Sequence, residues 1–98
     1  MRVFVTPSAR AELLRVVVAI RGRDRRAAAR FLADVETTIG AVVDGIESGP
    51  EIESPWRSAG APDGHRLYLR ERKNRLWLIA LWPDPIMRAE TESHGKIS

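Results

Sequence analysis

The three-residue connection at positions 22–24, between two amphipathic segments, is the feature that most constrains the fold. The first segment spans residues 7–21. Thr6 can cap a helix there, and Pro7 fits a first helical turn because its missing N–H would have no partner. The second segment spans residues 25–44 and repeats apolar residues at helical spacing. A connection this short makes two helices antiparallel neighbours, so we expect a helical hairpin.

Short stretches of β-branched or alternating residues flank the hairpin and predict strands. These stretches cover residues 2–6, 55–58, 65–72 and 75–82, with Lys73 and Asn74 as the turn between the last two. Glycines and prolines predict a loop over residues 45–55 and a turn over residues 59–64. This order of elements predicts an α+β fold. The N-terminal strand would belong to a small, mostly antiparallel sheet, and the helical hairpin would pack on one face of that sheet.

The length leaves room for a single domain, which we place at residues 1–90, with residues 91–98 as a flexible tail. The chain has no cysteine, which excludes a disulfide scaffold and a cysteine zinc site. The longest apolar run, residues 76–83, is far shorter than the roughly 20 residues of a membrane helix. Because the first ten residues also lack the pattern of a secretory signal, we expect a cytoplasmic protein without a membrane partner.

Charge is segregated along the chain. Residues 1–33 carry eight arginines and two acidic residues, whereas residues 34–63 carry one arginine and seven acidic residues. Residues 64–82 are basic again, with five basic residues and one glutamate. Such segregation is typical of a surface that meets a polyanion or an acidic partner, although solvated helix faces also produce it.

The last two strands allow a prediction for each residue. If Lys73 and Asn74 form the turn, Arg70 lies opposite Trp77, and the pairing continues up the hairpin without interruption. One face then holds Leu67, Leu69, Leu76, Leu78 and Ala80, and we expect it to pack on the helices. The other face holds Arg66, Tyr68, Arg70, Arg72, Arg75, Trp77, Ile79 and Leu81.

The second face is unusual for either a core or a solvated surface. A core rarely contains several arginines, and exposed apolar patches usually mark a partner site. We therefore predict a binding surface formed by Arg66, Tyr68, Arg70, Trp77, Ile79 and Leu81. The alternative is a structural hairpin whose arginine stems cover apolar surface. A slip of the register by one residue would invert the assignment.

Signals for catalysis are weak. The two histidines lack partners at metal-ligand spacing, so we expect no metal and no cofactor. A basic strand face could still cleave RNA, with Arg57, Arg66 and Arg70 contacting phosphate. The base would then be His65, Tyr68 or a carboxylate.

Three stretches in this order resemble the RelE/ParE superfamily of bacterial toxins, and its ParE branch most. They are VTPSARAEL at residues 5–13, RAAARFL at residues 26–32, and HRLY at residues 65–68 followed by the strand at 76–82. The resemblance spans roughly residues 2–82 and implies the fold predicted above. It also implies a type II toxin that is silenced by an antitoxin, whose C-terminal segment wraps the toxin.

The resemblance implies one of two activities. ParE-like members inhibit DNA gyrase by binding, and RelE-like members cleave messenger RNA on the ribosome without a metal. The ribonuclease branch places a histidine or tyrosine base just after the last strand, where this chain reads WPDP at residues 82–85. Many ParE sequences also place a histidine there. Because the chain resembles the ParE branch most, we expect a gyrase inhibitor, with the ribonuclease or an inactive toxin that binds only an antitoxin as alternatives. The predicted binding surface would receive the antitoxin or the target.

Overall fold

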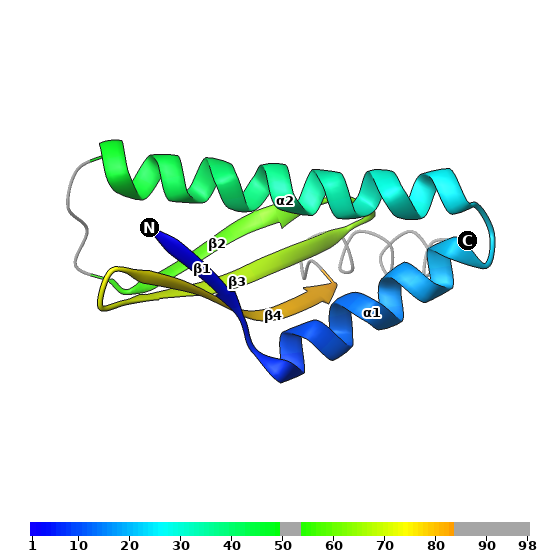
Figure 1. Ribbon diagram of the computed structural model, residues 1–98, viewed down its shortest axis with the longest axis horizontal. Coiled ribbons are helices and arrows are strands. Elements are labelled where there is room, and N and C mark those ends of the chain that lie inside the picture. Colours follow the sequence, from blue (N-terminus) through cyan, green and yellow to red (C-terminus); the bar gives the residue numbers. More distant parts are fainter. Residues whose placement is uncertain (50–53, 84–98) are drawn as a thin grey trace, which may run out of the picture.

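The computed structural model describes residues 1–49 and 54–83, which form two helices and one four-stranded sheet (Figure 1). The elements are β1 (Arg2–Val5), α1 (Pro7–Arg21), α2 (Arg25–Ser48), β2 (Trp56–Ala61), β3 (His65–Arg72) and β4 (Arg75–Pro83). The sheet order is β1-β4-β3-β2; β1 runs parallel to β4, and the other pairs are antiparallel. Both helices lie on the same side of the sheet. The predicted α+β fold with a helical hairpin on one face is confirmed.

Both helices begin at the predicted caps. The Thr6 hydroxyl accepts a hydrogen bond from the Ala9 backbone N–H at 3.2 Å. The Asp24 carboxylate accepts from the backbone N–H groups of Arg26 and Ala27 at 2.9 and 3.3 Å. These contacts satisfy donors that have no partner inside a helix, so the two caps fix the position of the hairpin connection.

Helix α2 is four residues longer than predicted, because it continues through Gly45 to Ser48. A glycine in a helix costs only about 1 kcal/mol relative to alanine. Ile46 packs against the core, as Val42 and Val43 do one turn earlier, and this burial outweighs the glycine. The predicted loop over residues 45–55 therefore begins later.

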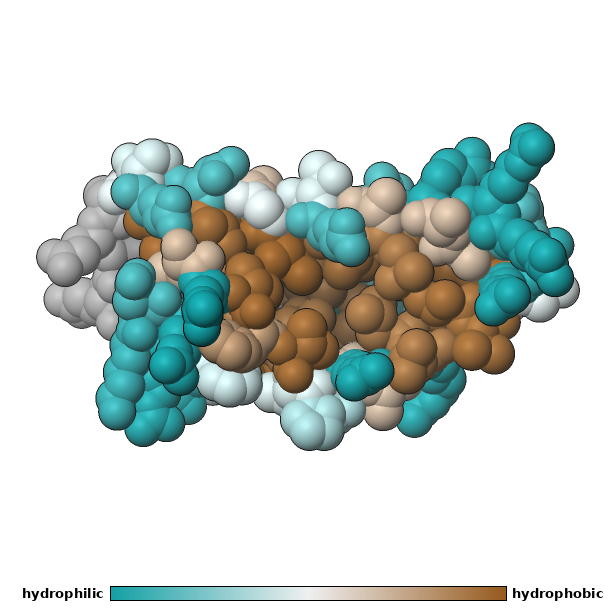
Figure 2. All heavy atoms as spheres, viewed as in Figure 1, coloured by the Kyte–Doolittle hydropathy of each residue, from teal (hydrophilic) through white to brown (hydrophobic). Residues whose placement is uncertain are grey.

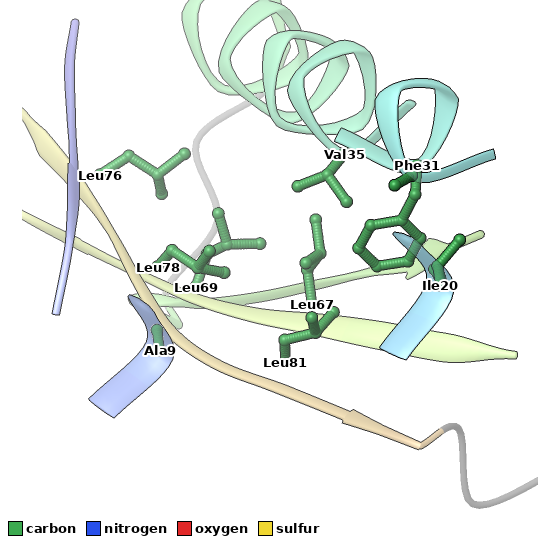
Figure 3. Packing of buried hydrophobic residues seen from close by; sticks show 10 residues of the cluster. Ala9, Ile20, Phe31, Val35, Leu67, Leu69, Leu76, Leu78 and Leu81 are labelled. Carbon is green, nitrogen blue, oxygen red and sulfur yellow. The ribbon is translucent and has the colours of Figure 1, made fainter. Parts of the chain in front are cut away.

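The core lies between the hairpin and the sheet (Figure 3). Leu67, Leu69, Leu76 and Leu78 of the sheet are fully buried, and Phe31 and Val35 of α2 and Ile20 of α1 meet them. The packing expected from the alternation of the last two strands is confirmed for these residues. Leu32, one position along α2, remains 37% exposed.

The hairpin between β3 and β4 follows the predicted register near its turn. Lys73 and Asn74 both adopt positive φ angles, of 51° and 60°, as a two-residue hairpin turn requires. Arg70 lies opposite Trp77 and Leu69 opposite Leu78, as predicted.

Beyond that point the predicted register is wrong. A β-bulge between Tyr68 and Leu69 on the β3 side makes Tyr68 pair with Ala80, so that Ile79 is the extra residue of β4. One extra residue inverts the alternation of every side chain that follows. Leu81 therefore pairs with Leu67 and is buried at 3% exposure, rather than lying on the face with Tyr68.

The strand β2 is longer than the predicted stretch of residues 55–58 and runs on through Gly60 to Ala61. Its continuous pairing with β3 outweighs the local preference of glycine for turns. The turn is therefore confined to three residues, and Asp63 and Gly64 adopt positive φ angles there. The predicted tail at residues 91–98 lies outside the described residues. No described helix combines the length and the apolar character that a membrane span requires.

Candidate functional site

The side of the sheet that faces away from the helices carries the most distinctive chemistry of the molecule. We call it the open sheet face and assign its members from the strand registers. They are Arg2, Phe4, Trp56, Ser58, Gly60, Arg66, Tyr68, Arg70, Arg72, Arg75, Trp77, Ala80 and Trp82. The chain has six aromatic residues, and five of them, including all three tryptophans, lie on this face.

The central part of the open sheet face is a row that crosses all four strands. Phe4 pairs with Trp77, Trp77 with Arg70, and Arg70 with Trp56. The Phe4 and Trp77 rings stack, with 4.7 Å between centroids and 22° between planes. The Arg70 guanidinium lies 5.3 Å above the centroid of the Trp56 ring. The row is therefore built of planar groups, some of which already stack on one another.

Arginines and further rings flank this row on both sides. On the turn side, Arg2 pairs with Arg75 and Arg75 with Arg72, and the Arg75 guanidinium lies 5.4 Å from the Phe4 centroid. On the other side, the Tyr68 and Trp82 rings are 5.1 Å apart. The bulge at Ile79 brings Trp82 to this face in place of Leu81.

Sequence reasoning missed Phe4, Trp56 and Trp82 as members of this face. The register of β1 and β2 against the hairpin decides the first two, and no local pattern fixes it. Trp82 depends on the bulge. Arg70 lies opposite Trp77, as predicted, and its guanidinium makes a cation–π contact with the Trp56 ring on the other neighbouring strand.

Acidic residues are absent from the open sheet face within the described strands. Their one glutamate, Glu71, lies on the helix side, where its carboxylate is 3.2 Å from the Arg57 guanidinium. Arg57 also donates to the Ser54 carbonyl at 2.6 Å, and its side chain is largely buried. The structure therefore separates Arg57 from Arg66 and Arg70, with which the sequence had grouped it as phosphate contacts.

The candidate bases are separated as well. His65 lies on the helix side with its ring edge against Phe31, at 6.0 Å between centroids. Tyr68 is on the open sheet face, and Arg66 beside it donates to the Ser58 hydroxyl at 3.2 Å. Within residues 1–49 and 54–83, no group of histidine, cysteine or acidic side chains is arranged to hold a metal ion.

A shallow pocket of about 240 Å³ lies at the turn end of the open sheet face and is lined by Arg72, Lys73, Arg75 and Trp77. It places cationic groups directly beside an aromatic ring. A larger pocket of about 520 Å³ lies between the helical connection and the β2–β3 turn. That pocket mixes charges of both signs, from Arg23, Arg30, Asp24, Asp34 and Asp63.

The helix side carries a second candidate surface. Figure 2 shows apolar residues gathered between the two helices, where the sheet is not covered. The large exposed apolar residues of β1, α1 and α2 are Val3, Val5, Leu14, Val18 and Leu32, which we call the helix-side apolar surface. Leu14 and Val18 are 52% and 67% exposed. Apolar patches of this kind are typical of partner sites.

The fold has a counterpart among solved structures. A chain described as "Chromosomal ParDE TA system from P. aeruginosa" matches with a TM-score of 0.59 and 13% sequence identity. The match covers 86% of this chain and 96% of that one. No family model and no curated protein sequence matched. The chain therefore shares the fold of that ParDE chain, and this is the fold that the resemblance of the three sequence stretches implied.

Proposed function

We propose that this chain is the toxin of a type II toxin–antitoxin module, that it inhibits DNA gyrase by binding, and that a cognate antitoxin neutralises it. The observation that carries the proposal is the fold shared with a chain of a ParDE system, together with an open sheet face suited to binding. Arg66, Tyr68, Arg70 and Trp77 of the open sheet face remain proposed contact residues, and so does Ile79, the partly exposed extra residue of the bulge. Trp82 takes the place of the buried Leu81.

The arrangement of side chains favours binding over RNA cleavage. Efficient general acid–base catalysis needs a base within hydrogen-bond reach of the reacting group, beside cations that stabilise the phosphate. Arg57 and His65 lie on the helix side of the sheet, so neither can act together with Arg66 and Arg70. Among the described residues that could act as the base, Tyr68 is then the one that lies on the same face as Arg66 and Arg70.

The two surfaces suit a wrapping antitoxin segment. Its apolar residues would cover the helix-side apolar surface, and its carboxylates would pair with arginines of the open sheet face, where bidentate contacts are strong. Binding on both sides of the sheet would block the surface that gyrase needs. A gyrase inhibitor of this kind acts in the cytoplasm, the location expected from the sequence.

The test is a supercoiling assay with purified gyrase, run beside a cleavage assay on ribosome-bound message. We expect loss of supercoiling, recovery when the antitoxin is added first, and an intact message. Tyr68→Phe should inhibit gyrase as the parent does, since no proton transfer is involved. Message cleavage that Tyr68→Phe abolishes would instead establish a ribonuclease. A protein that binds its antitoxin and affects neither assay would be an inactive toxin.

A further inference from the structure

We infer that the 520 Å³ pocket beside the helical connection binds a short apolar peptide of two or three residues whose N-terminus and C-terminus are both free. None of its lining residues belongs to the open sheet face or to the helix-side apolar surface, so this site is separate from the proposed function. Three features of the pocket point to this ligand: its apolar floor, the unpaired charges of both signs around that floor, and the distance between those charges.

The floor of the pocket is apolar and brings together three parts of the chain. Ile20 comes from the last turn of α1, Ala27 and Phe31 from α2, and Pro62 from the β2–β3 turn. Ile20 and Phe31 belong to the buried core, which holds both side chains in place before a ligand arrives. Small-molecule sites commonly combine such an apolar floor with a few polar groups, and 520 Å³ lies within their usual range of volumes.

Charged side chains of both signs stand around this floor. Arg23, Arg30, Asp34 and Asp63 line the pocket, and so does Asp24, whose carboxylate caps α2. Within residues 1–49 and 54–83 the ion pairs lie elsewhere, even though Arg30 and Asp34 are one helical turn apart. Two guanidinium groups and two carboxylates are therefore available to a ligand that carries charges of both signs.

The distance between these charges sets the length of the ligand. Arg23 lies beside the N-terminus of α2, where the helix dipole also favours an anion. Asp34 lies ten residues after the cap Asp24, which is about 15 Å along the helix axis. A peptide extends by at most about 3.3–3.6 Å per residue, and the arginine and aspartate side chains reach over the remaining distance. Two or three residues therefore connect a carboxylate near Arg23 and Arg30 to an ammonium group near Asp34, whereas a single amino acid is too short.

Other classes of ligand satisfy only part of this arrangement. An anion would place its charge among three carboxylates, and a cation would face two guanidinium groups, so each would meet repulsion as well as attraction. An internal segment of a partner protein has neither terminal charge. A free short peptide carries one charge of each sign at its ends and places an apolar side chain against Ile20 and Phe31 between them.

The test is a titration of the full chain with the tripeptide alanyl-phenylalanyl-alanine, followed by ¹H–¹⁵N correlation spectra. The backbone amide signals of Ala27, Phe31 and Asp63 should shift, because these residues line the pocket. Tryptophan fluorescence should stay unchanged, because all three tryptophans lie on the open sheet face, across the sheet from the helices and the pocket.

Blocked forms of the same tripeptide separate the contributions of its two ends. Amidation removes the negative charge of the C-terminus, and acetylation removes the positive charge of the N-terminus. Each should weaken binding by about three- to tenfold, the effect of losing one partly exposed ionic contact. The tripeptide blocked at both ends should bind more weakly than either singly blocked form.

Arginine variants assign the C-terminus of the peptide to its place in the pocket. Arg23→Gln combined with Arg30→Gln should weaken binding of the free tripeptide by about three- to tenfold. Amidation should then make no further difference, whereas acetylation still should. Arg25→Gln combined with Arg26→Gln is the matched control, because both arginines are exposed at the start of α2 and neither lines the pocket. The control should bind each form of the tripeptide as the parent does.

An aspartate variant assigns the N-terminus in the same way. Asp34→Asn should remove the effect of acetylation and keep the effect of amidation. Glu36→Gln is the matched control, because this carboxylate is exposed on α2 and lies outside the pocket. All the substituted side chains are exposed, so the fold should stay intact, and unchanged amide signals far from the substitution verify this in each variant.

Two results would overturn the inference. One is the absence of shifts at the pocket amides up to the solubility limit of the tripeptide. The other is equal binding of the free and the doubly blocked tripeptide, which would reduce the site to apolar contact without selection for free termini. Because the titration contains neither gyrase nor ribosomes, neither result changes the outcome expected in the supercoiling assay.

Discussion

At the scale of single residues, Ile79 decides which side chains reach the open sheet face. As the extra residue of the bulge, it turns Leu81 into the core and Trp82 outward. The bulge also places the Ile79 carbonyl where the Thr6 hydroxyl donates to it at 3.3 Å. The residue that caps α1 thereby also holds the irregular part of β4.

Leu81 and Trp82 therefore make a paired test of the bulge. Leu81→Ala should lower the free energy of unfolding by about 2–5 kcal/mol, because it leaves a cavity beside Leu67. Trp82→Ala should lower it by about 1 kcal/mol or less, because the ring is half-exposed. Urea denaturation of both variants measures the difference. A larger loss for Trp82→Ala would restore the uninterrupted register predicted from the sequence.

At the scale of elements, α2 binds the hairpin to the sheet through one narrow stripe. Ala28, Phe31 and Val35 are buried, whereas Leu32 beside them is partly exposed. Helix α1 contributes Ala9 and Ile20 to the same core, and the two helices diverge from their connection (Figure 1).

Phe31→Ala should cost about 3–5 kcal/mol, a large share of the stability of a domain of this size. Leu32→Ala should cost much less, since 37% of that side chain already contacts solvent. Thermal unfolding followed by circular dichroism checks both. Equal losses would mean that the stripe faces the sheet at a different angle from the one described.

At the scale of the whole molecule, two unlike surfaces lie on opposite sides of one small sheet. The open sheet face is basic and aromatic, and the helix-side apolar surface is uncharged. Exposed apolar patches are typical of partner sites, which fits the binding role proposed above.

Under the proposed function, antitoxin binding should depend on both surfaces in different ways. Trp77→Ala should weaken it by about 2 kcal/mol or more, since aromatic residues dominate such interfaces. Arg72→Ala and Arg75→Ala should mainly slow association, and the effect should shrink at high salt. Val18→Asp should leave the association rate and its dependence on salt unchanged. It should instead speed dissociation. Titration of each variant with the antitoxin at two salt concentrations measures these effects, and parental affinity for Trp77→Ala would confine the antitoxin to the helix side.

The sequence by itself determined the elements with strong local signals. Thr6 and Asp24 fixed the helix starts, and the short connection fixed the helical hairpin, because caps and turns act within a few residues. The same holds for Lys73 and Asn74, whose turn set the first pairs of the last hairpin. Arg66, Tyr68, Arg70 and Trp77 were placed on a common face correctly for this reason.

The tertiary structure decided everything that depends on partners far along the chain. The parallel pairing of β1 with β4 brought Phe4 onto Trp77, and the pairing of β2 with β3 brought Trp56 under Arg70 and turned Arg57 to the other side. The bulge exchanged Leu81 for Trp82. Side chains alternate along a strand, so a face is known only once the register is known, and the register depends on packing across the whole sheet.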